Sequence, residues 1–246
     1  MLATSQTSQT ARRPGAAPSP SSLAAPLVRR FRGFIEDGRF PCVGAKAALS
    51  RDRLAIVVAG DIRLAGEDRR IHAALVRMVR SYQHDKAMFR SLAVIFESPR
   101  RIGEPAFERH LWARLNSLHR IDRRHFGWSA AVSPDPADPH FGMSFAGAGF
   151  FVVGLHPGAS RPARRFVRPT LVFNMHDQFE RLRAEGRYDK MRATILERDR
   201  KLAGSINPML AAFGERSEAR QYSGRVVPEG WRCPFHAETT AREIHR

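Results

Sequence analysis

One segment of the chain combines a histidine with a cluster of arginines in a way that suits an anionic, metal-containing ligand. Residues 150–166 read FFVVGLHPGASRPARRF, in which an apolar run predicts a buried strand that ends at His156. Arg161, Arg164 and Arg165 follow in the next loop. A neutral imidazole can bind a metal, and guanidinium groups neutralise carboxylates or phosphates. The alternative interpretation is a histidine at a strand end beside solvated surface arginines.

A second segment places polar side chains where a strand gives way to a helix. In LVFNMHDQFERLR, Asn174 and His176 follow the apolar residues 171–173. Active-site residues often lie at such joins, because loops between regular elements carry much of protein function. Asn174 also suits a helix N-cap, and His176 a surface position in the first turn.

A third segment, residues 207–235, is rich in polar side chains and has no apolar stripe. It contains Glu215 and Glu218 among Asn, Arg, Gln, Tyr and Ser residues. Polar groups are costly to bury unless they pair with each other or with a ligand. The segment is therefore expected to form either a folded polar cap or part of a binding surface.

Several common cofactor and catalytic motifs are absent from the sequence. There is no G-x-x-x-x-G-K phosphate-binding loop and no H-E-x-x-H zinc motif. Two cysteines, Cys42 and Cys233, exclude a disulfide-dense scaffold and a four-cysteine zinc site. Ser160 and Ser223 lack the context of a nucleophile elbow.

The periodicity of apolar residues predicts the helices and strands that must position these residues. Together these elements predict an α+β fold. We expect one domain with a mixed or antiparallel sheet flanked by helices, plus an irregular C-terminal segment. The segment FPCVGAKAAL, residues 40–49, is expected to be a loop because it contains Pro41 and Gly44. Helices are expected over about 27–38, 67–83, 104–121, 177–184 and 188–202, and strands over about 54–59, 92–96, 143–155 and 169–173.

The two ends of the sequence differ in character. Residues 1–25 are rich in Ser, Thr, Pro, Ala and Gly and predict a disordered tail, whereas residues 26–246 predict a single domain. The tail lacks the apolar core of a secretory signal, so a cytoplasmic protein is expected. No run approaches the roughly 18 apolar residues that a membrane helix needs, so no membrane partner is expected.

The charge balance is strongly basic. The 246 residues carry 41 Lys and Arg against 24 Asp and Glu, which gives a formal net charge of +17. Lysine stands only at positions 46, 86, 190 and 201, so nearly all basic residues are arginine. They are scattered along the chain, which favours solvated surface side chains over one nucleic-acid-binding segment.

Four motifs and a final short one, in this order, resemble the YqcI/YcgG family over about residues 27–236. They are FPCVGAKAAL, DPADPHFGMSFAGAGFFVVGLHPGASRPARRF, PTLVFNMHDQFERLR, GSINPMLAAFGERSEARQYSGR and WRCPF. The best-understood members of that family are haem (heme)-dependent N-hydroxylases of arginine-derived metabolites, as in the pre-guanitoxin and D-cycloserine pathways. The resemblance implies a haem monooxygenase that hydroxylates an amino or guanidino group of a small cationic substrate, with an electron donor or peroxide as partner.

The resemblance also implies roles for individual residues. His156 becomes the first candidate for the axial iron ligand, and a histidine ligand leaves the opposite face of the iron open. Thiolate ligation favours O–O cleavage, which keeps Cys42 among the alternatives. The alternative ligands are His176, His140 and Cys42. The expected propionate-binding residues are Arg161, Arg164 and Arg165, and the expected catalytic or substrate-orienting residues are Asn174, His176 and Glu218, with Glu215 as an alternate.

Two other functions remain open at this point. A non-haem metal enzyme or hydrolase on the same fold would use His156, His176 and Glu218. A nucleic-acid-binding protein is suggested by the net charge alone, and no recognition motif supports it.

Overall fold

The structure, a computed structural model, describes residues 23–237. The predicted disordered tail therefore lies outside the described residues except for its last three positions. The last two of those positions, Ala24 and Ala25, are the first residues of helix α1 (Ala24–Glu36). No helix within residues 23–237 is long and apolar enough to cross a membrane.

An open five-stranded mixed sheet forms the centre of the fold, in the order β1-β2-β5-β4-β3. The first two strands are parallel, which requires a crossover, and α3 (Asp68–Asp85) supplies it. All other neighbours are antiparallel. This arrangement confirms the predicted α+β class. The strands are β1 (Leu54–Asp61), β2 (Ser91–Ser98), β3 (Met143–Phe145), β4 (Ala148–Leu155) and β5 (Thr170–Met175).

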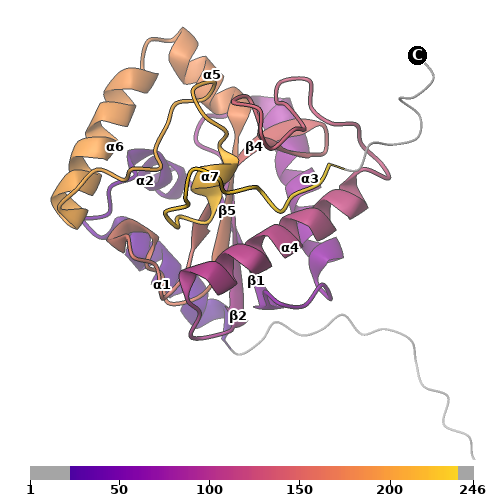
Figure 1. The fold of residues 1–246 in the computed structure, drawn as a ribbon, viewed down its shortest axis with the longest axis horizontal. Coiled ribbons are helices and arrows are strands. Elements are labelled where there is room, and N and C mark those ends of the chain that lie inside the picture. The colour runs from indigo at the N-terminus through magenta and orange to yellow at the C-terminus, as the bar shows by residue number, and fades with distance from the viewer. Residues whose placement is uncertain (1–22, 238–246) are drawn as a thin grey trace, which may run out of the picture.

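Helices cover both faces of the sheet (Figure 1). The larger core lies under α3 and α4 (Glu104–Asp122), and a second core lies under α1 and α2 (Val43–Ser50). On the side of α1 and α2, α6 (Tyr188–Ala203) forms an outer wall (Figure 1). The remaining helical segments are α5 (His176–Ala184), the short 3-10 turn η1 (Pro162–Arg164) and α7 (Ala219–Tyr222).

Strand β4 sends alternate side chains into the two cores, as a period of two requires. Phe150 and Val152 pack into the α3/α4 core, whereas Val153 packs against the α1/α2 core and Phe151 lines the cavity on that side, with its ring also against Tyr222. Gly154 permits α4 to approach, because a Cβ there would lie 2.6 Å from Cε1 of Phe107. Since both faces of β4 are covered, its sequence is apolar throughout and does not reveal which residue faces which side.

The loop predicted over residues 40–49 is wrong from Val43 onward. Residues 43–50 form α2, because Cys42 caps the helix: its Sγ accepts a hydrogen bond from the N–H of Ala45 at 3.4 Å. The alanines that follow have the highest helix propensity of any residue, and they outweigh Gly44.

The C-terminal segment is irregular as predicted, with α7 as its only helix among the described residues after α6. Tyr222 anchors it to the sheet, because its buried hydroxyl donates to O of Phe150 at 3.0 Å and accepts the N–H of Met143 at 3.2 Å. These bonds attach the segment to the first residue of β3 and to the N-terminal half of β4.

Candidate functional site

A cavity of about 320 Å³ lies between the sheet and the helices α1, α2, α5 and α6. Its volume falls in the range of small-molecule sites, about 300–1,000 Å³. Aliphatic and aromatic side chains make up most of its wall, and polar groups enter it at a few places. The aromatic part of the wall comprises Phe31, Phe34, Phe40, Phe89, Phe151, Phe179, Tyr188 and Phe213.

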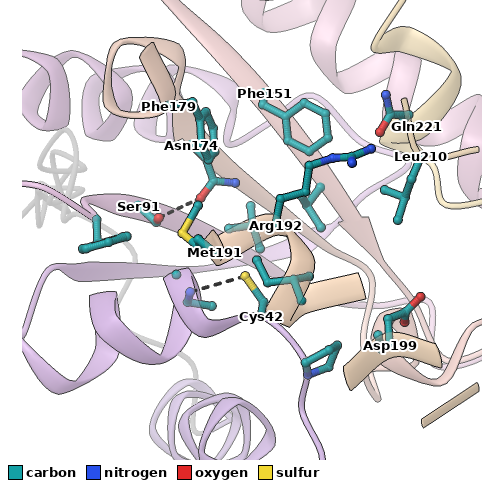
Figure 2. Close-up of a pocket in the computed structure, with 18 of the residues that line it drawn as sticks. Cys42, Ser91, Phe151, Asn174, Phe179, Met191, Arg192, Asp199, Leu210 and Gln221 are labelled. Atoms are coloured by element: carbon teal, nitrogen blue, oxygen red, sulfur yellow. Dashed lines mark hydrogen bonds between the residues drawn. The ribbon is translucent and has the colours of Figure 1, made fainter. Parts of the chain in front are cut away.

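One row of residues across three strands forms the polar part of the cavity floor. Asn174 of β5 pairs with Ser91 of β2 on one side and with Phe151 of β4 on the other. The Ser91 hydroxyl donates to Oδ1 of Asn174 at 2.7 Å, as Figure 2 shows. The amide N–H₂ of Asn174 has no acceptor among the described residues and can donate to a ligand. Asn174 is not a helix N-cap, because Met175 occupies that position of α5.

Cys42 brings a thiol to the cavity wall at the N-terminus of α2 (Figure 2). Burial raises the pKa of this thiol above its ordinary value, and the N–H groups of Ala45 and Gly44 and the charge of Arg164 oppose that rise. The same N–H groups and the same arginine would stabilise a thiolate if a metal displaced the proton.

His176 and Glu218 form a buried acid–imidazole pair at the opposite end of the cavity from the strand ends near η1. Nε2 of His176 lies 2.8 Å from Oε2 of Glu218, and both side chains are more than nine-tenths buried. Burial raises the pKa of Glu218, and the hydrogen bond and charge of His176 oppose the rise. The pair can therefore hold one shared proton next to the cavity.

Arg161 reaches the cavity but its guanidinium is used by the protein. It forms a buried ion pair with Asp199 of α6 and donates to Oγ and O of Ser205, at 3.0 Å and 2.7 Å. Arg161 thus ties η1 to the C-terminal end of α6. These bonds use three of the five N–H donors of Arg161, so most of its guanidinium serves the protein rather than a propionate, and its buried Nε has no partner among the described residues.

Arg164 lines the cavity without a carboxylate partner. Its guanidinium donates to three backbone oxygens, those of Gly154 at 3.1 Å, Tyr222 at 3.3 Å and Gln221 at 3.3 Å. Burial lowers its pKa to about 10, and the nearby Asp199 and Cys42 oppose the shift. Among the described residues, no acidic side chain lies within ion-pair distance of this cation. An anion in the cavity would compensate it.

His156 does not line the cavity. His156 directly follows β4, and its side chain lies on the same face of the sheet as Gly154. Its ring therefore points to the α3/α4 side and stacks on Phe107, with ring centroids 4.4 Å apart. Its Nδ1 lies 3.3 Å from O of Ile102, and burial lowers its pKa. The histidine predicted as the first iron ligand is therefore not placed to bind a metal inside this cavity.

Arg165 and two alternate residues also lie elsewhere. Arg165 is exposed and closes its own loop by donating to the backbone oxygens of Ala159 and Ser160. His140 is exposed beside Asp138, and Glu215 is exposed and bonds the N–H of Ala212.

A metal site of three side-chain ligands is not assembled within residues 23–237. No group of three or more His, Cys, Asp and Glu residues there could hold a metal ion. His176 and Glu218 meet, but His156 is on the other face of the sheet. The set of ligands expected for a non-haem enzyme is therefore not brought together.

Of the predicted site residues, the structure brings six to the cavity: Cys42, Arg161, Arg164, Asn174, His176 and Glu218. Sequence reasoning missed Ser91, Arg192 and Asp199, which also line it. The last two belong to α6, whose apolar side chains gave only a helical stripe. No spacing signal could have found Asp199, because its partner Arg161 lies in a different element.

An open mixed sheet with an aromatic cavity on one face defines an α+β protein with a site of ligand-binding size. The chain matches the sequence pattern of the YqcI/YcgG family over residues 31–236, and it belongs to that family. No curated protein and no solved structure matches it.

Proposed function

We propose that this protein is a haem-dependent oxygenase that N-hydroxylates an amino or guanidino group of a small metabolite, and that its cavity holds the haem. The observation that carries the proposal is the placement of Cys42. Its thiol caps α2 and lies on the wall of an apolar cavity of about 320 Å³. Because a porphyrin supplies the equatorial nitrogens itself, one protein ligand suffices for the iron.

The residues around Cys42 fit an axial thiolate. The N–H of Ala45 is bonded to the sulfur, and the Arg164 guanidinium acts on it electrostatically. Hydrogen bonds and a nearby cation stabilise a thiolate and tune a thiolate-bound metal. Bound haem would supply oxygen activation, and a thiolate ligand favours cleavage of the O–O bond.

The other polar residues of the cavity suit work on a substrate. The His176–Glu218 pair can hold or pass a proton at Nε2 of His176, which is general acid–base chemistry. Asn174 offers its amide N–H₂ and, together with the Glu218 carboxylate, can orient an amine or guanidine. The phenylalanines of the wall exclude water, which suits a reactive oxidant.

The test is the absorbance spectrum of the protein purified after expression with a haem precursor. We expect a Soret band with the features of thiolate ligation, which Cys42→Ser removes. Serine is a good N-cap, so α2 should stay folded in this variant. Cys233→Ser is the matched control, because Cys233 is the other cysteine of the chain and packs against the α3/α4 core.

Two results would contradict the proposal. Wild-type protein that remains colourless and takes up no haem would reject a haem enzyme. A spectrum that Cys42→Ser leaves unchanged would reject Cys42 as the ligand. The spectrum of His176→Ala would then test whether the His176 imidazole is the axial ligand instead.

A further inference from the structure

Four arginines line the cavity, and they differ in what their guanidinium groups contact. Arg161 is paired with Asp199. Arg183 is paired with Glu180 and stacks over the ring of Tyr188 at 4.2 Å. Arg164 donates to three backbone oxygens, as described above. Arg192 is the fourth, and among the described residues it has neither a hydrogen-bond acceptor nor an acidic partner.

Arg192 is positioned by α6 to reach a ligand. It is half-buried, and it stands one helical turn from Ile195 and Leu196, which line the same cavity. Figure 2 shows its side chain extending from the helix across the cavity toward the wall that carries Gln221 and Leu210. A cation in such surroundings is stabilised when an anion pairs with it, because the cavity wall is mostly apolar.

The charges inside the cavity do not balance without a ligand. Asp199 is used by Arg161, and Glu218 by His176. Arg164 and Arg192 are then the cations without an acidic partner among the described cavity residues. A thiolate at Cys42 would compensate Arg164, since these two groups interact electrostatically. No protein anion remains for Arg192.

We infer that Arg192 is a carboxylate-binding residue of this cavity. Its planar fork matches a carboxylate in a bidentate geometry. Two sources can supply that carboxylate: a propionate of the haem, or the carboxylate of an amino-acid-like substrate. The inference rests on the proposed function for the first source, whereas the second holds with or without haem.

The experiment compares pairs of probes that differ in a carboxylate, using Arg192→Gln in the full-length chain. Metal-free protoporphyrin IX and its dimethyl ester form the first pair, with binding read from porphyrin fluorescence. L-Arginine and agmatine form the second pair, with binding to the porphyrin-free protein read by calorimetry. Arg198→Gln is the matched control, because Arg198 lies on the same helix, is exposed and does not line the cavity.

If Arg192 binds a propionate, Arg192→Gln weakens protoporphyrin IX binding by about 10- to 100-fold, the usual range for a charge-assisted bond, and leaves the dimethyl ester unaffected. If it binds a substrate carboxylate, the same variant weakens L-arginine and not agmatine. Arg192→Lys should restore part of either loss, since it keeps the charge and loses the fork.

The inference is overturned if Arg192→Gln changes none of the four affinities relative to Arg198→Gln, including the case in which none of the probes binds. Failure of the proposed function looks different. Protein that binds no porphyrin, yet distinguishes L-arginine from agmatine through Arg192, would reject the haem enzyme and keep the carboxylate site.

Discussion

At the scale of single residues, neighbouring positions at the end of β4 point to opposite faces of the sheet, one toward the cavity side and the next toward the α3/α4 core. Leu155 faces the α1/α2 side, whereas His156, the next residue, stacks on Phe107 under α4. Cys42 instead reaches the cavity from the start of a helix, where backbone N–H groups favour negative charge on the sulfur. Side-chain direction therefore places the Cys42 thiol, and not the His156 imidazole, at the cavity wall.

The protonation state of Cys42 gives a pH-dependent prediction for haem binding. Burial raises the pKa of the thiol above its ordinary value, so the thiol is protonated at neutral pH. Because a metal takes the thiolate, binding releases one proton, and affinity should increase with pH by up to about tenfold per unit between about pH 6 and pH 8. Haem titrations of the purified protein at several pH values measure this slope.

Cys42→His serves as the comparison for that slope. An imidazole with an ordinary pKa of about 6.5 is already neutral over most of the same range, so its pH dependence should be weaker. A wild-type affinity that does not change with pH would argue against a thiolate ligand.

At the scale of elements, α6 is a cavity wall rather than a core helix. Met191, Ile195 and Leu196 line the cavity and are only half-buried, and Asp199 is the one buried residue of the helix. Its attachment depends on the ion pair between Asp199 and Arg161 of the loop after β4. Arg161, expected from the sequence to bind a cofactor, thus anchors α6, the helix that forms a wall of the cavity.

Removal of one partner of this ion pair should destabilise the protein more than removal of both. Arg161→Leu leaves Asp199 as an unpaired buried charge, and such losses cost about 3–5 kcal/mol. The double variant with Asp199→Leu should recover most of that loss. Urea unfolding of the two variants and the wild type gives the free energies of unfolding. Equal destabilisation of the single and double variants would show that the pair does not anchor α6.

At the scale of the whole molecule, the arginines behind the net charge of +17 are scattered along the sequence rather than grouped in one segment. Many arginines form surface ion pairs with an acidic residue nearby in the sequence, such as Arg63 with Asp61 and Arg200 with Glu197. Such pairs contribute little to stability, and each one neutralises the charge of its arginine locally. The positive net charge of the molecule will attract anions. Two arginines without an acidic partner among the described residues, Arg164 and Arg192, line the cavity.

This distribution predicts weak and unspecific nucleic-acid binding. Affinity for duplex DNA should fall steeply with salt, with a slope of about −0.9 per phosphate contact, and should be lost near the physiological ionic strength of about 0.15 M. Fluorescence anisotropy with two unrelated duplexes over a salt series tests this. Binding that persists at this ionic strength and prefers one duplex would instead support a nucleic-acid-binding protein.

The sequence determined most of the elements, though not α2, and the family of this protein. Periodicity located the helices and strands, because each buries an apolar stripe or face, and the ordered motifs identified the YqcI/YcgG family. It also singled out Asn174, His176 and Glu218, which meet at the cavity although 42 residues separate the histidine from the glutamate.

Tertiary structure alone decided which polar residues share the cavity. Strand β4 is apolar on both faces, so its sequence could not assign His156 to one side. The partners of Arg161 and the lack of a partner for Arg192 depend on where α6 packs, and α6 is placed by contacts between distant segments. Local sequence encodes which side chains are apolar, whereas the pairing of charges depends on distances that only the folded chain sets.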